Sequence, residues 1–292
     1  MHVTFRQLRL FLALAETGSV SRAAASMHVT QPTASAQLKE ITLSVGLPLY
    51  EVIGKRVHLT DAGRELALAA RAMTGEWDAF TQRVDQMKGL SRGHLRVAAV
   101  STAKYFIPRL IGSFCRAHPA IEVSLEVLNR DGVLARLKEN RDDIYVMSMP
   151  PEGMDLEDDV FMENPLVVIA ARGAKFGARL ALADLKGQRF ILRETGSGTR
   201  MATDRHFARR RFKPDIRLAL GSNEAIKEAV AGGLGIGVIS RHALQGGKDI
   251  KVLAVEGFPI SSRWHVVHPR AKQLSPIAAA FRAHLLARAG HP

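Results

Sequence analysis

Three periodicities of apolar residues divide the chain. Residues 1–60 contain short helical repeats followed by two strand-like runs, and residues 61–91 contain one long repeat of the kind found in paired helices. From residue 92 onward, short apolar runs alternate with helical ones. The pattern predicts an α+β multidomain chain with a small helical domain (1–60), a linker helix (61–91) and an α/β domain (92–292).

The amino-terminal segment predicts two helices before residue 29. Thr4 is suited to cap the first, whose apolar positions recur at helical spacing and which Gly18 ends as a left-handed stop. Ser21 is expected to cap the second. The second helix contains three consecutive alanines, residues 23–25, whose small side chains allow another helix to approach closely.

A third helix is predicted after a tight turn at Val29-Thr30. Thr30 is expected to cap it, and Pro32 falls in the first turn, where a missing N–H costs nothing. The apolar positions of this helix are Ala34, Leu38, Ile41 and Val45, and Gln31, Ser35 and Lys39 share another face. A helix with small polar groups and one cation on its outer face fits a DNA major groove. Two helices joined in this way form a helix-turn-helix.

The run from Leu49 to Thr60 predicts two short strands around a Gly54-Lys55-Arg56 tip, which is a wing. Its two cations suit a phosphate backbone or a minor groove. We expect the side chains of the third helix to approach base edges, and Lys39 and the wing cations to contact phosphates. The predicted DNA contacts are Ser21, Arg22, Thr30, Gln31, Pro32, Thr33, Ser35, Lys39, Lys55 and Arg56.

The linker segment carries apolar residues that alternate four and three apart, as in a heptad repeat. These residues are Leu66, Ala70, Met73, Trp77, Phe80, Val84 and Met87. One interpretation is a helix packed on its own domain. The length and regularity of the stripe favour a dimerisation seam, which would also pair two DNA-reading heads on a two-fold site.

Beyond Arg92-Gly93, strands and helices alternate, which predicts α/β units with mostly parallel sheets. Strands are expected near 95–100, 121–127, 143–147, 165–170, 189–192 and 236–240, and helices near 107–117, 133–139 and 223–231. Ligands of such sheets lie beyond the carboxyl ends of strands, near helix N-termini.

Three polar segments follow predicted strands and favour a small anionic ligand. They are residues 101–106, which supply hydroxyls and a lysine, residues 194–200, which supply glycines, hydroxyls and Arg200, and residues 221–224. Ordinary helix capping explains each segment taken singly. Three such segments in one α/β module favour convergence on a shared anion site.

The composition and net charge of the chain indicate an anionic partner. The hydrophobic and charged fractions, 47% and 24%, are those of a globular protein. The net charge of +13 and the pI near 10.4 favour nucleic acid. Residues 1–60 hold little of this excess, and we interpret the cationic run 205–213 as a solvated helix end.

The single cysteine, Cys115, excludes an internal disulfide and suits a reducing cytosol. No apolar run reaches the ~20 residues that span a bilayer, and we interpret the amino-terminal segment as a working helix and not as a signal peptide. We therefore expect a cytoplasmic protein without a membrane partner.

Signatures of catalysis and metal binding are weak. The glycines of residues 233–237 lie between a helix and a strand, the reverse of the dinucleotide-binding order. His265 and His268 would face opposite sides of a strand and so cannot share a metal. We predict no cofactor, no metal and no enzyme activity. A DNA reader fused to a catalytic domain is the remaining enzymatic alternative.

Several motifs in order resemble the LysR-type transcriptional regulators. They are residues 5–8 (FRQL), 18–24 (GSVSRAA), 30–35 (TQPTAS), 46–51 (GLPLYE) and 59–63 (LTDAG). The chain departs from the family pattern at Ile41-Thr42, where Leu-Glu is usual, and at Val52, where arginine is usual. The resemblance implies a winged helix-turn-helix, a linker helix and an effector module similar to periplasmic binding proteins. It extends over essentially the whole chain.

On this resemblance, residues 93–162 and 268–292 would form lobe I and residues 163–267 lobe II, with the ligand between them. The implied effector-binding residues are Ser101, Thr102, Lys104, Asn129, Met147, Thr195, Ser197, Gly198, Thr199, Arg200, Asn223 and Glu224. The partners implied are double-stranded promoter DNA, a second copy in a dimer and usually a tetramer, a small anionic metabolite and RNA polymerase.

More narrowly, residues 101–106, 129–130, 192–200, 220–224 and 264–268 resemble the branch that controls the Calvin-cycle (RuBisCO) operon. That branch implies a carbon-fixation activator that responds to a sugar phosphate, phosphoenolpyruvate or NADPH. Two alternatives stay open. One is a LysR-type regulator of another pathway with an aromatic or amino-acid effector, and the other is a solute-binding module that does not touch DNA.

Overall fold

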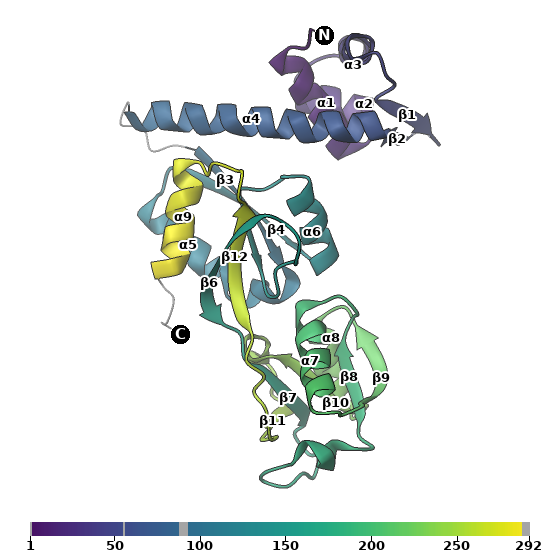
Figure 1. The fold of residues 1–292 in the computed structure, drawn as a ribbon, viewed down its shortest axis with the longest axis vertical. Coiled ribbons are helices and arrows are strands. Elements are labelled where there is room, and N and C mark those ends of the chain that lie inside the picture. Colours follow the sequence, from purple (N-terminus) through teal and green to yellow (C-terminus); the bar gives the residue numbers. More distant parts are fainter. Residues whose placement is uncertain (1, 55, 88–92, 288–292) are drawn as a thin grey trace. The chain divides into compact units, whose positions relative to one another are not determined.

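The computed structural model describes residues 2–54, 56–87 and 93–287. The contacts within it divide the chain into an amino-terminal unit, with helices α1 to α4 and one hairpin, and a carboxy-terminal unit with two five-stranded sheets (Figure 1). Lys55, at the predicted wing tip, lies outside the described residues, as do the side chain of Met87 and the predicted boundary at Arg92.

The first three helices form at the predicted places. Their bounds are α1 Phe5–Thr17, α2 Val20–Ser26 and α3 Gln31–Val45. Thr4 and Thr30 cap α1 and α3 as expected, and Gly18 ends α1 at φ 61°. The expected cap at Ser21 was wrong. Ser19 caps α2, because its extended backbone directs the hydroxyl at the N–H of Arg22, whereas Ser21 already lies in the helix.

One face of each of the helices α1 to α4 packs into the hydrophobic core of the amino-terminal unit. Phe11, Leu14, Ala34, Leu38 and Ile41 are fully buried in it. A side-chain hydrogen bond from Gln7 Nε2 to Glu40 Oε2, 2.8 Å long, fixes α1 against α3 at the edge of this core. The apolar face predicted for α3 is therefore the inner face of that helix.

The predicted wing is a hairpin of β1 (Tyr50–Ile53) and β2 (Arg56–Leu59), which pair antiparallel. The following helix, α4 (Asp61–Met87), begins beside the hairpin, where a side chain on Gly63 would overlap the carbonyl oxygen of Leu49. Only glycine permits this close approach, so Gly63 sets how the long helix leaves the wing.

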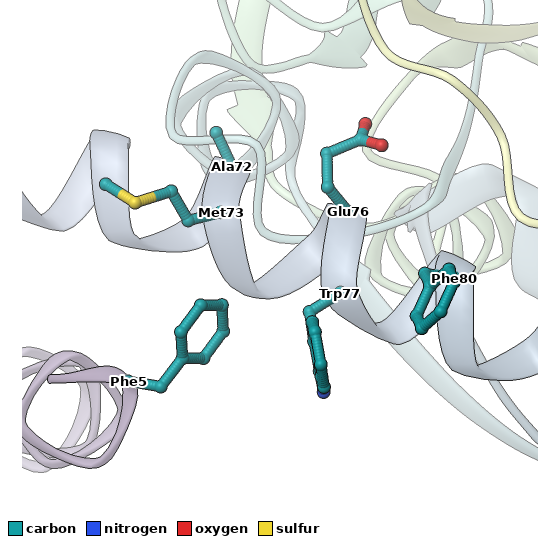
Figure 2. Close-up of a pocket in the computed structure, with 6 residues that line it drawn as sticks. All are labelled: Phe5, Ala72, Met73, Glu76, Trp77 and Phe80. Carbon is teal, nitrogen blue, oxygen red and sulfur yellow. The ribbon is translucent and has the colours of Figure 1, made fainter.

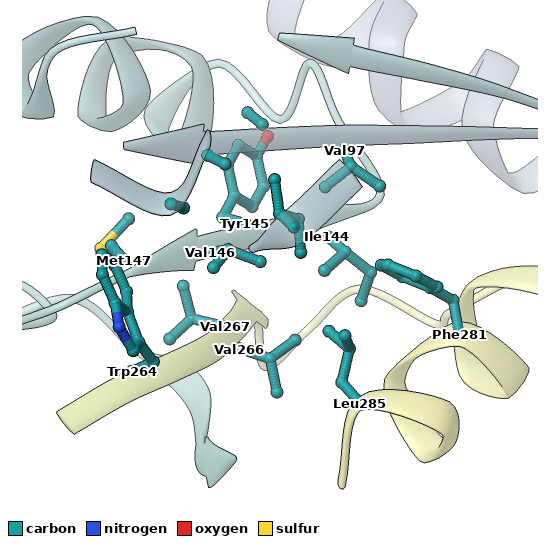
Figure 3. Close-up of a cluster of buried hydrophobic side chains, with 14 of the residues drawn as sticks. Val97, Ile144, Tyr145, Val146, Met147, Trp264, Val266, Val267, Phe281 and Leu285 are labelled. Atoms are coloured by element: carbon teal, nitrogen blue, oxygen red, sulfur yellow. The ribbon is translucent and has the colours of Figure 1, made fainter. Parts of the chain in front are cut away.

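In the carboxy-terminal unit, lobe I is built on a sheet with strand order β4-β3-β5-β12-β6. The strands are β3 Gly93–Val100, β4 Ile121–Leu128, β5 Ile144–Met147, β6 Leu156–Glu163 and β12 Arg263–Pro269. The helices are η1 Ser101–Tyr105, α5 Ile107–Ala117, α6 Arg130–Lys138 and α9 Pro276–Ala287. Figure 3 shows its core, where Tyr145, Trp264 and Phe281 are fully buried.

Lobe II is built on a sheet with strand order β11-β7-β10-β8-β9. The strands are β7 Leu166–Ala171, β8 Arg189–Arg193, β9 Asp215–Leu220, β10 Ile236–Ser240 and β11 Ile250–Leu253. The helices are η2 Leu182–Leu185, α7 Gly198–Arg209, α8 Asn223–Ala231 and η3 Arg241–Leu244. Val168 packs in a core with Phe207 of α7, and its neighbour Ile169 in another with Ile226 of α8, so both faces of the sheet are covered.

Both sheets are mixed, which corrects the expectation of mostly parallel sheets. In each sheet two pairings are parallel and two are antiparallel. Antiparallel pairs arise where the chain passes from one lobe to the other, since the returning strand β12 inserts between β5 and β6.

The two crossing segments are hydrogen-bonded to each other. Asn164 N donates to Ser262 O over 2.8 Å, and Leu166 and Ile260 exchange two further bonds of 3.0 and 2.9 Å. Because β12 begins at Arg263 and belongs to the first sheet, the return crossing lies about residue 262. The predicted boundary at 267/268 was therefore about five residues late, and lobe II consists of residues 164–262.

Within the described part of the chain, no helix has the length and apolar character that a bilayer crossing requires.

Candidate DNA-reading surface and effector site

The outer face of α3 is exposed at every predicted position. Gln31, Pro32, Thr33, Ser35 and Lys39 all face solvent, whereas Ala34 and Leu38 between them are fully buried. Thr33 also belongs to the cap, because its hydroxyl lies 2.8 Å from that of Thr30. The exposed amide of Gln31, hydroxyl of Ser35 and ammonium of Lys39 form no side-chain hydrogen bond among residues 2–54 and 56–87, so they are accessible to an external partner.

Three more of the predicted DNA contacts are exposed on α2 and β2, and Thr30 is exposed as the cap of α3. Ser21 and Arg22 lie on α2, and the guanidinium of Arg22 donates to the carbonyl oxygen of Thr17. Arg56 is exposed at the start of β2. Among the ion pairs of residues 2–54 and 56–87, none involves Arg22, Lys39 or Arg56. These three cations carry positive charge that no carboxylate offsets, as a phosphate-binding surface requires.

A separate apolar hollow of about 440 Å³ lies between α1 and α4, and Figure 2 shows the aromatic rings that line it. The ring of Trp77 lies 5.6 Å from those of Phe5 and Phe80, centroid to centroid. The residues Phe5, Met73, Trp77 and Phe80 are 42–49% exposed, which is unusual for side chains of this size.

The predicted heptad stripe divides into two parts. Ala70 is fully buried in the core of the amino-terminal unit, and Leu66 packs partly against the same core. These two residues have little surface left for a second chain, because α4 begins against its own domain. The exposed part of the stripe begins at Met73 and continues through Trp77 and Phe80.

Three polar strand ends meet at the junction of the lobes, around the buried guanidinium of Arg193. This side chain, at the end of β8, is 3% exposed. It donates to Thr102 Oγ1 over 3.0 Å and to Ser101 Oγ over 3.2 Å, both on η1 of lobe I. Within lobe II, it donates to the carbonyl oxygen of Gly221 over 3.2 Å.

Glu194 neutralises Arg193 in this arrangement. Its carboxylate accepts from Arg193 Nε over 2.7 Å and from Nη2 over 2.9 Å, so it occupies one side of the guanidinium fork. The Glu194 side chain is 29% exposed, whereas that of Arg193 is almost inaccessible. A buried cation with an accessible counterion can exchange that counterion for an external anion.

Asn223 and Glu224, at the start of α8, also contact the other lobe. Asn223 Nδ2 donates to Thr102 Oγ1 over 3.2 Å, and its buried Oδ1 has no hydrogen-bond partner among the described residues. Glu224 accepts from Lys104 Nζ over 2.9 Å and from the Tyr105 hydroxyl over 2.6 Å. We call the residues Ser101, Thr102, Lys104, Tyr105, Arg193, Glu194, Asn223 and Glu224 the interlobe network.

The network changes two pKa values. Burial alone would raise the pKa of Glu224, but the hydrogen bonds from Tyr105 and Lys104 outweigh burial and lower it to about 2. Burial, followed by the hydrogen bond to Glu224, raises the pKa of Tyr105. Glu224 is thus ionised and Tyr105 neutral at neutral pH, which is the state that their hydrogen bond needs.

The other predicted effector residues lie in different positions. Ser197 caps α7, a side chain on Gly198 would overlap Ser148 of lobe I, and Thr199 is buried. Arg200 pairs with Asp204 and also donates to the carbonyl oxygen of Arg193 over 3.1 Å. These four residues therefore support the junction from the lobe II side.

Three predicted effector residues lie apart from the network. Asn129 is exposed, and its Oδ1 accepts from Gly132 N over 2.9 Å at the start of α6, which is a capping role. Met147 is fully buried in the core of lobe I. Thr195 is exposed in the loop before α7.

The predicted effector-binding residues do not include Arg193, Glu194 and Tyr105, although Tyr105 and Glu194 lie in the polar segments 101–106 and 194–200 that were expected to converge. A signal was present, since Arg193 and Glu194 directly follow the buried strand residues Phe190 to Leu192. Two charged residues directly after a buried strand must form ion pairs or hydrogen bonds, or extend their side chains into solvent. In the described part of the chain, His, Cys, Asp and Glu side chains form no group suited to hold a metal ion.

Two family models match the chain. The bacterial regulatory helix-turn-helix protein model of the lysR family matches residues 5–64, and the LysR substrate binding domain model matches residues 88–290. The similarity therefore includes both units, and most of α4 lies between the two matched segments.

Curated relatives match over nearly the full length. The chain is 42% identical to the HTH-type transcriptional activator CmpR of Synechocystis sp., over 98% of this chain and 96% of that protein. It is 41% identical to the RuBisCO operon transcriptional regulator of Acidithiobacillus ferrooxidans, over 98% and 94%.

Solved structures agree with the fold. The CcmR regulatory domain of Synechocystis PCC6803 in complex with 2-PG matches at 44% identity and TM-score 0.65, covering 68% of this chain and 99% of that one. Full-length CbnR complexed with its target DNA matches at 25% identity and TM-score 0.71, covering 98% and 100%.

Proposed function

The chain belongs to the LysR family of DNA-binding transcriptional regulators, and on that premise we propose that it controls carbon-fixation genes in response to a small anionic metabolite. Family membership excludes the alternatives of a catalytic domain and of a solute-binding module without DNA function. The observation that carries the effector proposal is the buried Arg193, which joins the lobes and has a partly exposed counterion, Glu194.

The DNA-reading surface is proposed to be the outer face of α3 with the cations of α2 and β2. Gln31, Thr33 and Ser35 would approach base edges in the major groove, since amides and hydroxyls read base edges there. Arg22, Lys39 and Arg56 would contact phosphates. The CbnR relative, whose structure contains target DNA, supports this role for the amino-terminal unit.

A second copy is proposed to cover the apolar hollow of α1 and α4. Met73, Trp77 and Phe80 lie on one stripe of α4, and their exposure is costly in water unless a partner removes it. A two-fold pair of DNA-reading heads would follow, with a tetramer as its usual completion in this family. DNA binding places the protein in the cytoplasm in this account.

The effector is proposed to bind at the interlobe network. An anionic group would displace the Glu194 carboxylate from the fork of Arg193, and a hydroxyl on the ligand would satisfy the unpartnered Asn223 Oδ1. The CcmR relative, solved in complex with 2-PG, supports a small anion in this branch. Binding would alter how the lobes contact one another and hence the DNA-bound state.

Calorimetry with the full-length protein tests the proposal. The panel contains 2-PG, phosphoenolpyruvate, NADPH and a sugar phosphate, with benzoate and an amino acid as representatives of the rival effector classes. We expect one phosphorylated anion to bind at least tenfold more tightly than benzoate or the amino acid. Tighter binding of benzoate or the amino acid would assign the protein to another pathway.

A further inference from the structure

Charge is distributed unequally over the two lobes. Lobe II, residues 164–262, contains 17 Lys and Arg against eight Asp and Glu, whereas residues 93–163 and 263–292 contain 13 against 12. Residues 1–60, which contain the DNA-reading surface, contain six against three. Most of the net charge of +13 therefore lies on lobe II and away from the DNA-reading unit.

The acidic side chains of lobe I are offset within the lobe. Arg270 pairs with Asp155 and Glu157, and Arg282 pairs with Asp159. His265 Nδ1 lies 2.5 Å from Asp158. Each of the four carboxylates in the sequence run 155–159 therefore has a partner within lobe I, and two of them share Arg270.

Lobe II, by contrast, has exposed cations without ion-pair partners among the described residues at the end of α7. Arg209, Arg210, Arg211 and Lys213, which we call the basic turn, are all exposed. None of them takes part in an ion pair within the described residues. By contrast, the neighbouring Arg205 pairs with Glu152 at 3.4 Å.

The backbone concentrates these charges. Arg211 adopts a left-handed backbone conformation, with φ 52°, and so turns the chain directly after α7. A side chain on Gly257 would overlap the guanidinium of Arg210, so the arginine lies flat over that glycine. Burial lowers the pKa of His206, and the charges of Arg210 and Arg209 lower it further.

Stabilisation of the helix dipole does not account for the basic turn. One or two cations in the last turn of a helix interact favourably with its carbonyl end, and the helical residue Arg209 fits that role. Additional cations in the same place repel one another and cost stability unless an anion is bound. The turn therefore has more charge than the fold needs.

The apolar residues of the turn favour a phosphate backbone over an acidic protein. Phe207 is buried and Phe212 packs against the same core, so the segment offers charge without an apolar centre. Protein interfaces usually have such a centre, whereas DNA phosphates need only cations and N–H donors. Three of the four residues are arginines, whose planar forks match phosphate oxygens.

We propose that the basic turn of lobe II binds the phosphate backbone of duplex DNA beside the operator, as a second DNA contact distinct from α3 and the wing. This contact would read no sequence. It would favour long DNA over a short operator and would make binding more sensitive to salt.

The test uses full-length protein and an operator selected from genomic DNA by the wild-type chain. Fluorescence anisotropy compares an operator-length duplex with one extended on both sides, over a series of salt concentrations. The variant is Arg209→Ala/Arg211→Ala, which spares the packed Arg210. The matched control is Lys175→Ala/Lys248→Ala, which removes two exposed cations beside β11, at the opposite edge of the sheet.

The wild type is expected to bind the extended duplex about tenfold more tightly than the short one, and the variant to lose this preference with a salt slope lower by about 2. The control variant should retain both. Equal affinity of wild type and variant on the extended duplex would overturn the proposal, as would an equal loss on both duplexes. Normal DNA binding by the variant with lost transcription in a reconstituted assay would also overturn it, in favour of an acidic protein partner.

Discussion

The DNA-reading surface and the interlobe network differ in how far apart their residues lie in the sequence. All residues of the first lie between positions 21 and 56, on two helices and a hairpin. The second joins side chains 91 to 121 positions apart, such as Arg193 with Thr102 and Asn223 with Thr102. The first is therefore fixed by local structure, and the second by the packing of two lobes.

The two regions also differ in how their cations are held. Arg22, Lys39 and Arg56 are exposed and lie outside the ion pairs of the described residues, so they can contact phosphates without breaking an ion pair. Arg193 is buried and donates to four residues. In the proposed site, an external anion would reach it by displacing the Glu194 carboxylate. The difference indicates that DNA contact and effector contact can be altered separately.

The largest effect is expected for Arg193→Met. The change removes the cation that bridges the lobes, and truncating a buried, hydrogen-bonded charge costs several kcal/mol, so affinity for the anionic effector should fall by about 100-fold or more. DNA affinity without effector should stay within about twofold. Calorimetry and anisotropy measure the two. Arg205→Met, which removes an exposed arginine of the same lobe, is the control, and equal behaviour of the two variants would contradict the prediction.

Lys39→Ala/Arg56→Ala should have the converse effect. Loss of two phosphate contacts should weaken DNA binding by about tenfold and reduce the salt slope by about 2, while effector affinity is unchanged. Arg9→Ala, whose arginine pairs with Asp78, is the control. An unaltered salt slope in anisotropy titrations would remove these cations from the interface.

Glu194→Gln should strengthen effector binding. The change removes the charge that occupies the fork of Arg193, so an anionic ligand should bind about fivefold more tightly. Calorimetry checks this against Glu228→Gln, which alters an exposed carboxylate on α8. Weaker binding in the Glu194 variant would show that the carboxylate holds the site in shape and does not compete for it.

The smallest effect concerns Glu224→Gln. The pKa of Glu224 is lowered from 4.5 to about 2, so the stability that its ionised form contributes is present above pH 4.5 and is lost as the pH falls towards 2. The half-exposed carboxylate limits this contribution to about 1 kcal/mol or less.

Denaturant unfolding of the full-length wild type and the Glu224 variant measures this contribution as a function of pH. Their difference in unfolding free energy should be constant from pH 8 to 5 and shrink below pH 4.5. A difference that stays the same at pH 3 would show that the contact does not depend on charge.

The DNA-reading surface could be predicted more fully from the sequence than the interlobe network, because its residues are close together in the chain. Capping at Thr4 and Thr30, the exposed face of α3 and the wing strands follow from neighbouring residues, and they were predicted within a residue or two. The error at the α2 cap has the same origin, since Ser19 and Ser21 are both good capping residues and only the backbone decides between them.

The interlobe network was predicted only in part. The three polar strand ends were identified, because hydroxyls and glycines after strands have a local signature. Arg193 was omitted, because its role depends on the hydroxyls of Ser101 and Thr102 in the other lobe. The apolar stripe on α4 is likewise divided by tertiary packing, which buries its first part in the helix's own domain and leaves the next part exposed. A heptad repeat does not specify where this division falls.

An anion bound through Arg193 is expected to change how the amino-terminal surface binds DNA. Footprinting on the selected operator tests it, with wild type and Arg193→Met in the presence and absence of the anion that binds most tightly in calorimetry. The account predicts that the anion alters the wild-type footprint and leaves the Arg193→Met footprint identical to that without ligand. An anion-induced change of the same size in both proteins, or in neither, would contradict it.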